Sequence, residues 1–373
     1  MQVNSLGQQS MLKFLCQCAL VVCLPFSAVA HGATVLFLNP GHADETFWVS
    51  YSQFMQAAAK NLHLQLQIRY ADRSAPTAVA QAREALKGEV RPDYLVFVNE
   101  EYIAPQILRM AKDSGVKLFM VNNALTPEQL SLVGPELERD PYWIGSMVAN
   151  DEEAGYLMLS EIIRQHGPVS AGQSVDLLAF SGPKNTPAAQ LREKGLYRAL
   201  AEHPEVRLRQ RVYGEWNKNR AYDQATLLLK RYPATALIWS ANDEMAFGAM
   251  QAAQEAGKVV GRDVLFSAVN SSIPALEARI DGRLSALVGG HFTLGGWAMV
   301  LIGDDAKGIE ISQFGGRNRK VPLLQLIDRQ QAQHLLVQVR SETWQVPFAR
   351  LSAQGKPASW HYPFSLNTVL QAP

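Results

Sequence analysis

Short apolar runs alternate with amphipathic stretches along most of this 373-residue chain, and this alternation constrains the fold more than any other feature. After the first run, apolar residues recur every three or four positions, which predicts a helix. Strand-like runs that alternate with helices are typical of a parallel sheet covered on both faces. We predict strands at residues 34–38, 64–70, 94–98 and 117–121, and again at 175–180, 206–213, 236–239, 264–269 and 284–288.

The strands fall into two series, which predicts two lobes. Gly134-Pro135 and Asp140-Pro141 interrupt the pattern between the series, and residues 142–148 then resemble a strand that crosses into the second lobe. A chain of this length corresponds to about two domains. The predicted fold class is therefore α/β, with two Rossmann-like doubly wound lobes. Ligands of such sheets collect at the carboxyl ends of the strands.

The N-terminus has the pattern of an export signal. Lys13 precedes an apolar run at residues 14–26, and small residues at Ala28 and Ala30 fit the cleavage rule of signal peptidase. The run is shorter than the ~20 residues of a membrane-spanning helix. We therefore predict a signal peptide at residues 1–30 and a periplasmic protein. Met11 is an alternative start, and Cys23 is an alternative lipidation site that the bulky Val22 disfavours.

The predicted signal contains all three cysteines, Cys16, Cys18 and Cys23, so the processed chain would have no thiol for a disulfide or a metal. Lys13 is the one charged residue in 1–30, which leaves 34 basic and 34 acidic residues in the remainder. This balance argues against nucleic acid or an anionic membrane surface as the main partner.

Motifs of metal, cofactor and catalytic sites are missing from the sequence. The eight histidines form no i, i+4 pair, and there is no Walker loop, G-x-S-x-G elbow or dinucleotide fingerprint after the first strand. We therefore expect no metal, no cofactor and no enzyme activity. His42, Asp44 and Glu45, which share one loop, are the acid/base alternative.

The most specific motif is SANDEMAFGAM at residues 240–250. Physically, it is a buried strand followed by a helix with an Asn cap and acidic residues in its first turn. It also resembles the NDxxAxG stretch of type I periplasmic binding proteins, the ribose-binding family, which shares its fold with LacI-type repressors. Together with residues 39–48 and 192–196, the resemblance covers residues 33–310. Because the chain lacks a helix-turn-helix head, the resemblance implies the binding-protein branch.

The resemblance implies ligand contacts in the first lobe. Asn39 ends the first strand, where a polar residue usually faces the cleft, and Asn123 follows the fourth strand. Phe47 and Trp48 take the places of aromatic rings that stack on a sugar. Their loop, residues 40–48, resembles that of autoinducer-2 receptors in length. A core role for Trp48 and a capping role for Asn123 are the structural alternatives.

In the second lobe the resemblance points to five further residues. Gln190 and Arg192 flank the cleft arginine position of the family, and Trp216 matches an aromatic residue that covers the ligand. Asn242 and Asp243 belong to the NDxxAxG motif. The alternatives are a surface salt bridge for Arg192, an N-cap for Asn242, worth ~1 kcal/mol, and a helix-dipole partner for Asp243.

Two positions depart from the pattern of the family. Asn270 stands where hexose and pentose binders usually carry Asp, and His291 follows Gly289-Gly290 where Gln or Arg commonly returns to the cleft. These departures predict a more neutral pocket that is larger at one corner. Ribose itself is therefore not the expected ligand.

The resemblance also implies the domain organisation. We expect an N-terminal lobe of residues 31–148 plus about 290–320, a C-terminal lobe of residues 149–289, and an extension of residues 321–373 packed on the lobes. Crossover strands near residues 148 and 289 would form the hinge. A monomer that closes on a small sugar-like ligand would present it to an inner-membrane ABC permease. A membrane sensor kinase or cyclase is the alternative partner.

Overall fold

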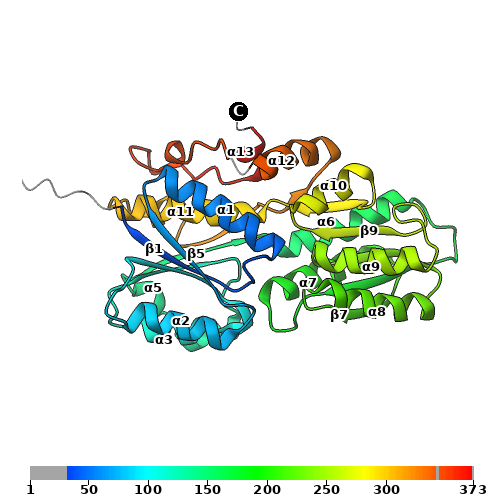
Figure 1. The fold of residues 1–373 in the computed structure, drawn as a ribbon, viewed down its shortest axis with the longest axis horizontal. Coiled ribbons are helices and arrows are strands. Elements are labelled where there is room, and N and C mark those ends of the chain that lie inside the picture. The colour runs from blue at the N-terminus through cyan, green and yellow to red at the C-terminus, as the bar shows by residue number, and fades with distance from the viewer. Residues whose placement is uncertain (1–31, 342–343, 372–373) are drawn as a thin grey trace, which may run out of the picture. The chain divides into compact units, whose positions relative to one another are not determined.

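Two mostly parallel β-sheets, one in each lobe, organise residues 32–341 and 344–371, the part of the chain that the computed structural model describes (Figure 1). The strand order is β11-β5-β4-β3-β1-β2 in the first sheet and β12-β10-β9-β8-β6-β7 in the second. Pairing is parallel throughout except between β10 and β12. The predicted signal peptide, with its cysteines, lies outside the described residues.

The strands that the sequence predicted, β1 to β10, begin and end within two residues of their predicted positions. Those of the first sheet are β1 (Thr34–Asn39), β2 (Gln65–Tyr70), β3 (Tyr94–Val98), β4 (Lys117–Val121), β5 (Trp143–Ala149) and β11 (Asn318–Val321). Those of the second are β6 (Val175–Ser181), β7 (Val206–Tyr213), β8 (Thr235–Ser240), β9 (Leu265–Val269), β10 (Ala286–Gly289) and β12 (Gln325–Leu326). Short β11 and β12 lack a long apolar run, and neither was predicted.

Helices cover both faces of each sheet. In the first lobe they are α1 (Thr46–Asn61), α2 (Ala75–Lys87), α3 (Ala104–Ala111), α4 (Pro127–Val133), α5 (Glu136–Arg139) and α11 (Leu294–Ala306). In the second lobe they are α6 (Asp151–His166), α7 (Pro187–Glu202), α8 (Lys218–Arg231), α9 (Asp243–Glu255) and α10 (Ile273–Asp281). The remaining helices are α12 (Arg329–Ser341) and α13 (Leu366–Leu370), and the 3₁₀ turns are η1 (Glu100–Tyr102), η2 (His291–Thr293), η3 (Ile311–Phe314) and η4 (Phe348–Leu351).

Alternating strand residues divide the first lobe's core into two layers. Val35 and Phe37 of β1 pack on the side of α1 and α11, whereas Leu36 and Leu38 pack on the side of α2 and α3 (Figure 1). This follows from the two-residue period of a strand. Both faces of the sheet are thus buried, as a parallel sheet requires.

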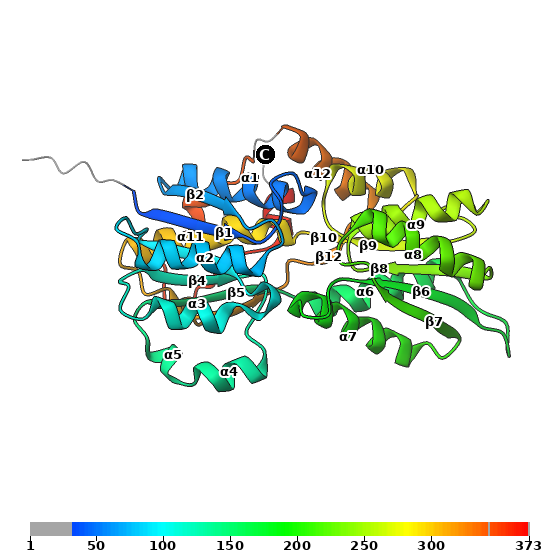
Figure 2. The same cartoon turned by 60° about the horizontal axis from the view of Figure 1, so that its bottom comes forward.

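Three segments connect the lobes, where we predicted two. The chain crosses after β5, after β10, and a third time between β11 and β12. In Figure 2, β10 and β12 lie side by side between the lobes, and they pair through Val288 and Leu326. The prediction of a hinge near residues 148 and 289 was therefore incomplete, because the short strands of the third crossing carry no periodic signal.

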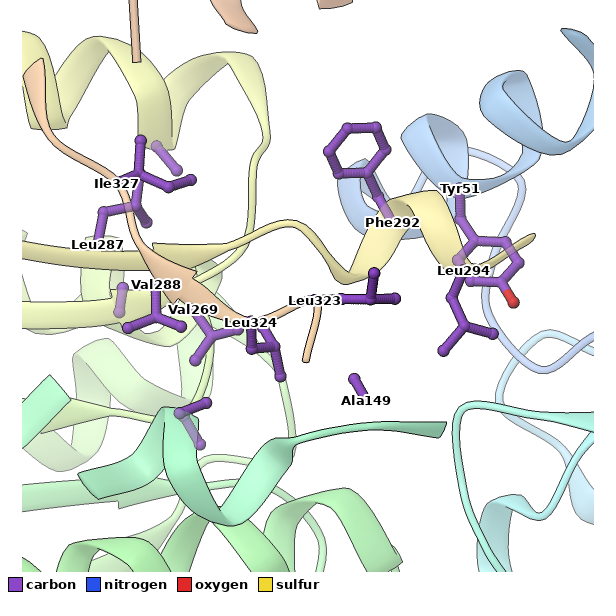
Figure 3. Close-up of a cluster of buried hydrophobic side chains, with 14 of the residues drawn as sticks. Tyr51, Ala149, Val269, Leu287, Val288, Phe292, Leu294, Leu323, Leu324 and Ile327 are labelled. Carbon is purple, nitrogen blue, oxygen red and sulfur yellow. The ribbon is translucent and has the colours of Figure 1, made fainter. Parts of the chain in front are cut away.

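The crossing segments are fastened to one another. The Asn150 side chain donates to Leu324 O and accepts from Leu324 N, both at 2.9 Å, which ties the first crossing to the third. Gly290 has φ of 117°, and a Cβ there would lie 2.3 Å from Leu323 O, so only glycine fits. Buried apolar side chains from all three segments surround this point (Figure 3). Any hinge motion must therefore involve all three connections together.

The C-terminal residues pack first on one lobe and then on the other. Helix α12 contacts α10 of the second lobe. The chain then returns to α1 and α11, where Phe348 lies against Phe54 and Phe364 stacks on Trp297 at 5.3 Å between ring centroids. Helix α11 is buried along its length because the sheet covers one side and this extension the other.

Asp304 of α11 anchors the extension. Its buried carboxylate accepts hydrogen bonds from Ser352 Oγ, from Ala353 N at 2.7 Å and from Tyr362 OH at 2.8 Å.

We expect Tyr362→Phe to lower the free energy of unfolding by about 1–2 kcal/mol, because the buried carboxylate of Asp304 loses one donor. Urea denaturation measures this change. In Tyr222→Phe, which removes a surface tyrosine–Glu255 bond, the loss should stay below about 1 kcal/mol; equal losses in the two variants would contradict the anchoring role.

Candidate functional site

A cavity lies where the carboxyl ends of the two sheets meet, lined by residues of both lobes. Its volume is about 60 Å³. Because one water needs roughly 10–15 Å³ of such space, there is room for on the order of five waters, which corresponds to one small ring. The site therefore fits a single compact polar molecule.

Eight of the residues predicted from the family resemblance line this cavity: Phe47, Trp48, Asn123, Arg192, Trp216, Asn242, Asn270 and His291. Phe47 and Trp48 lie in the first turn of α1 and Arg192 lies in α7, whereas the other five follow the ends of different strands. The parallel sheets bring these segments to one place. Asn242 also caps α9, because its Oδ1 accepts from Met245 N at 2.9 Å. Its Nδ2 donates to Trp216 O at 3.3 Å, so this one amide joins the helix cap to the aromatic wall.

Three predicted residues do not line the cavity. Asn39 is buried and shapes its own loop, since its Oδ1 accepts from Gly41 N at 2.9 Å. Gln190 is exposed on the outer rim, where its Nε2 donates to Tyr102 OH at 2.6 Å. Asp243 lies behind Asn270 and accepts from its Nδ2 at 2.5 Å. The resemblance pointed to segments that border the cavity, but which side chain faces inward depends on the local backbone.

Charged side chains form part of the cavity wall in the first lobe. The expectation of a more neutral pocket was therefore wrong for this part of the wall. Arg73 donates to both oxygens of the Glu45 carboxylate and, at 3.3 Å, to Glu100 Oε1. Burial lowers the pKa of Arg73, but the two carboxylates outweigh this effect and the net pKa is raised. Burial raises the pKa of Glu100, against the opposing effects of Arg73 and Thr186.

Sequence reasoning missed Arg73 and Glu100 as cavity residues, and it assigned Glu45 only to an acid/base alternative. Arg73 follows β2 and Glu100 follows β3 at the same sheet edge as Asn123, so the rule of strand ends would have found both. Asn122, Thr186 and Ala188 complete the lining. His42 and Asp44 are exposed and do not line the cavity, so the three residues of the acid/base alternative do not gather there.

Residues of the first lobe cap the N-terminus of α7 in the second lobe. Thr186 is the N-cap residue, yet its side chain does not cap its own helix and instead donates to Glu100 Oε1 at 3.1 Å. The free N–H of Ala188 donates to Asn123 Oδ1 at 3.1 Å, and Asn123 Nδ2 donates to Glu100 Oε2 at 3.0 Å. A carboxylate is also favoured at a helix N-terminus. We term these bonds the interlobe clasp. Those from Thr186 to Glu100 and from Ala188 to Asn123 join the two lobes and can exist only while the lobes are in contact.

A buried ion pair supports the opposite wall. Arg192 contacts Asp151 Oδ1 through Nε at 2.9 Å and Nη2 at 2.8 Å, and its Nη1 donates to Ala241 O at 2.7 Å. The guanidinium also lies 5.8 Å from the ring centroid of Trp216. Arg192 is therefore a buried structural cation that also lines the cavity, not the surface salt bridge of the alternative interpretation.

Aromatic rings close the cavity from both lobes. Phe47 stacks on His291 at 4.5 Å between ring centroids. The pKa of His291 is lowered well below its usual value by burial and by the positive charge of Arg192. In the other lobe, Trp216 fits against Gly182, where a Cβ would lie 2.1 Å from Trp216 Cζ2. The walls thus combine a neutral imidazole, two indoles and a phenyl ring.

Backbone strain concentrates at this site. Four lining residues that are not glycine have positive φ: Arg73 at 58°, Asn122 at 68°, Trp216 at 63° and Asn270 at 146°. Such conformations cost on the order of 1–3 kcal/mol each and persist where the surrounding structure imposes them, often at ligand sites. Each follows a different strand, which is consistent with loops shaped for binding.

Within residues 32–341 and 344–371, no three His, Cys, Asp or Glu side chains are grouped so as to hold a metal ion. In the same part of the chain, no helix has the length and apolar character needed to cross a membrane.

Comparison with known proteins identifies relatives over most of the chain. The family described as periplasmic binding protein domain matches residues 35–308. The crystal structure of a periplasmic sugar-binding protein from Pseudomonas fluorescens is 58% identical, covers 91% of this chain and 100% of its own, and superposes with a TM-score of 0.85. A crystal structure of a galactofuranose-binding protein, 18% identical over 83% of this chain and 99% of its own, shares the fold with a TM-score of 0.69.

Curated relatives match over shorter stretches. The galactofuranose-binding protein YtfQ of Escherichia coli is 21% identical over 185 residues, which are 49% of this chain and 54% of that protein. The D-apiose import binding protein of Actinobacillus succinogenes is 24% identical, over 48% of this chain and 56% of that protein. The chain thus spans little more than half the length of these relatives. The two-lobed α/β fold predicted from the sequence is confirmed, and the chain belongs to the periplasmic binding protein domain family.

Proposed function

We propose that this protein captures one small, uncharged, sugar-like molecule in the cavity between its lobes and delivers it to an ABC-type permease of the inner membrane. The observation that carries the proposal is the cavity itself, which joins aromatic rings and amides of both lobes in a space of about 60 Å³. Aromatic faces bury the apolar side of a sugar ring, while amides bind its hydroxyl groups.

The charges of the wall favour a neutral ligand. Arg73 pairs with both Glu45 and Glu100, and Arg192 is paired with Asp151. A charged ligand would enter a buried site where every ionic side chain of the wall already has a partner, which costs free energy. Polyhydroxylated neutral molecules meet no such penalty.

The relatives support the same class of ligand and the transport role. Their names include galactofuranose, D-apiose, xylitol and ribose binding proteins, two of them described as import binding proteins. We accordingly propose a periplasmic, monomeric, non-enzymatic receptor. The sensory alternative has no comparable support from these relatives.

Closure follows from contacts that only the closed form makes. Phe47 and Trp48 belong to the first lobe, and Trp216, Asn242 and Asn270 to the second. A ligand that binds both groups favours the closed form by its differential affinity, and no chemical step is needed.

A thermal-shift panel tests the proposal with D-ribose, D-allose, D-galactose, L-arabinose, xylitol and myo-inositol. A ligand at 100 times its Kd adds about 2.7 kcal/mol to the folded state, which raises the melting temperature measurably. We expect at least one panel member to do so, and Trp216→Ala and Asn242→Ala to abolish its effect. Leu227→Ala, at an exposed surface position, serves as the control. The sugar assignment fails if no panel member shifts the melting temperature.

A further inference from the structure

Asp243 is buried next to the cavity without lining it, and its carboxylate has no cationic partner among the described residues. It is 0% exposed, and it accepts from Asn270 Nδ2 at 2.5 Å, from Ser272 Oγ, and from Glu244 N at 3.0 Å. Asp243 lies in the first turn of α9, where the positive end of the helix dipole stabilises a carboxylate. The carboxylate is therefore held by neutral donors alone.

The bond to Asp243 determines which end of the Asn270 amide is available to a ligand. Because Nδ2 is held by Asp243, Oδ1 is the free end, and among the described residues none donates to it. Asn270 lines the cavity with a strained φ of 146°. An amide without this constraint can turn over and offer its NH₂ group instead.

The same loop also holds the second crossing between the lobes. Ser271 Oγ accepts from Gly290 N at 3.2 Å, and Ser272 Oγ accepts from Ala275 N at 3.2 Å to cap α10. Residues 270–272 thus connect the cavity, the crossing and a helix cap, and Asp243 fastens this loop at both Asn270 and Ser272.

Resting on the proposed function, we propose that Asp243 is a positioning residue for ligand recognition: its carboxylate fixes the Asn270 amide so that Oδ1 faces the cavity and accepts a hydrogen bond from a ligand hydroxyl. Asp243 itself does not touch the ligand. A protonated Asp243 carboxyl accepts hydrogen bonds from Asn270 and Ser272 less well than the carboxylate does. It therefore holds the Asn270 amide less firmly, and ligand binding should weaken when Asp243 takes up a proton.

The ionised carboxylate is costly for the fold, which argues against a purely structural role. Burial raises the pKa of Asp243 from 3.8 to about 6, against the opposing bonds from Ser272 and Asn270. As pH rises from 3.8 to about 6, the unfolded chain loses this proton before the folded protein does, so stability falls through that window and stays lower above it. Glu244 on the same helix adds to the rise, whereas Asn270 and Ser272, which face Asp243 from the β9–α10 loop, are uncharged.

The test compares Asp243→Asn with wild type, using the panel sugar that most raises the wild-type melting temperature. We expect wild-type affinity, measured by calorimetry, to fall roughly tenfold from pH 8 to pH 5. Asp243→Asn should bind about tenfold more weakly at pH 8, with no further loss at pH 5, and should melt no lower than wild type at pH 8. Wild-type affinity in Asp243→Asn at pH 8 would overturn the proposal.

Exchange of the two groups provides a matched rescue. In Asp243→Asn combined with Asn270→Asp, the new amide at position 243 can donate to the new carboxylate at position 270, which still presents an oxygen to the cavity. We expect its affinity at pH 8 to return to within about threefold of wild type. A double variant as weak as the single one would overturn the pairing.

A ligand-free measurement separates this proposal from the proposed function. The side-chain amide signals of Asn270, assigned in NMR spectra through Asn270→Asp, should shift with an apparent pKa of about 6 in wild type and lose that titration in Asp243→Asn. If the titration is observed but no panel sugar binds, the sugar assignment fails while the Asp243–Asn270 pairing stands. If the signals do not titrate between pH 4 and pH 8, the positioning role is wrong.

Discussion

Arg192→Ala is expected to lower the free energy of unfolding by roughly 3–5 kcal/mol at pH 8. The side chains of Arg192 and Asp151 are only 6% and 4% exposed, so the variant leaves a carboxylate buried without its partner. Ala241 O loses its donor as well. The urea denaturation midpoint of wild type and variant measures this loss.

The loss should shrink in acid. Burial raises the pKa of Asp151, and the charge of Arg192 opposes that rise, so removing Arg192 raises the pKa further. The folded variant then binds a proton that the unfolded chain has already released, and lowering the pH stabilises it relative to wild type. A pH series of denaturation curves between 5 and 8 should show this convergence.

Two matched variants control the experiment. Lys194→Ala, on the same helix, removes a surface pair with Glu152 in which the lysine is 69% exposed, and it should cost less than about 1 kcal/mol. Arg192→Met combined with Asp151→Leu removes both charges and should recover most of the stability. An Arg192→Ala protein that loses less than Lys194→Ala would show that the pair is not a buried support of the fold.

Glu100→Ala is expected to weaken binding of the panel sugar by about 100-fold. Glu100 accepts two hydrogen bonds of the interlobe clasp, from Thr186 at 3.1 Å and from Asn123 at 3.0 Å. It also accepts one from Arg73 at 3.3 Å. Hydrogen bonds to a charged group contribute about 1.5–3 kcal/mol each, and 1.4 kcal/mol corresponds to a tenfold change in affinity. Calorimetric titration of wild type and variant gives the ratio of dissociation constants.

The neighbouring acid separates the clasp from general charge effects. Glu101 is exposed and makes none of the clasp hydrogen bonds, so Glu101→Gln should bind within about twofold of wild type. Fluorescence energy transfer between dyes on Lys112 and Lys230 positions, one in each lobe, should report a smaller closed population in Glu100→Ala without ligand. Unchanged transfer together with unchanged affinity would contradict the clasp.

The sequence alone located the strands and the edge at which ligands collect. Strand periodicity depends on local alternation of apolar residues, which is visible in the chain, and parallel strands must bring their carboxyl ends to one edge. The family resemblance pointed to Trp216, Asn242 and Asn270, and their positions after three different strands agree with a single site at this edge. Arg73 and Glu100 obeyed the same rule and were overlooked.

Only the tertiary structure decided how those side chains are used. Asn242 and Asp243 are adjacent in sequence, yet Asn242 lines the cavity, whereas Asp243 does not line it and accepts a hydrogen bond from Asn270. Asn123 was assigned to the ligand, but its amide bonds reach Glu100 and the N-terminus of α7 in the other lobe. Side-chain direction at the end of a strand depends on φ and ψ of one or two loop residues, and partners that are 23 to 65 positions apart meet only through the fold. These are properties of long-range packing, and no local sequence pattern carries them.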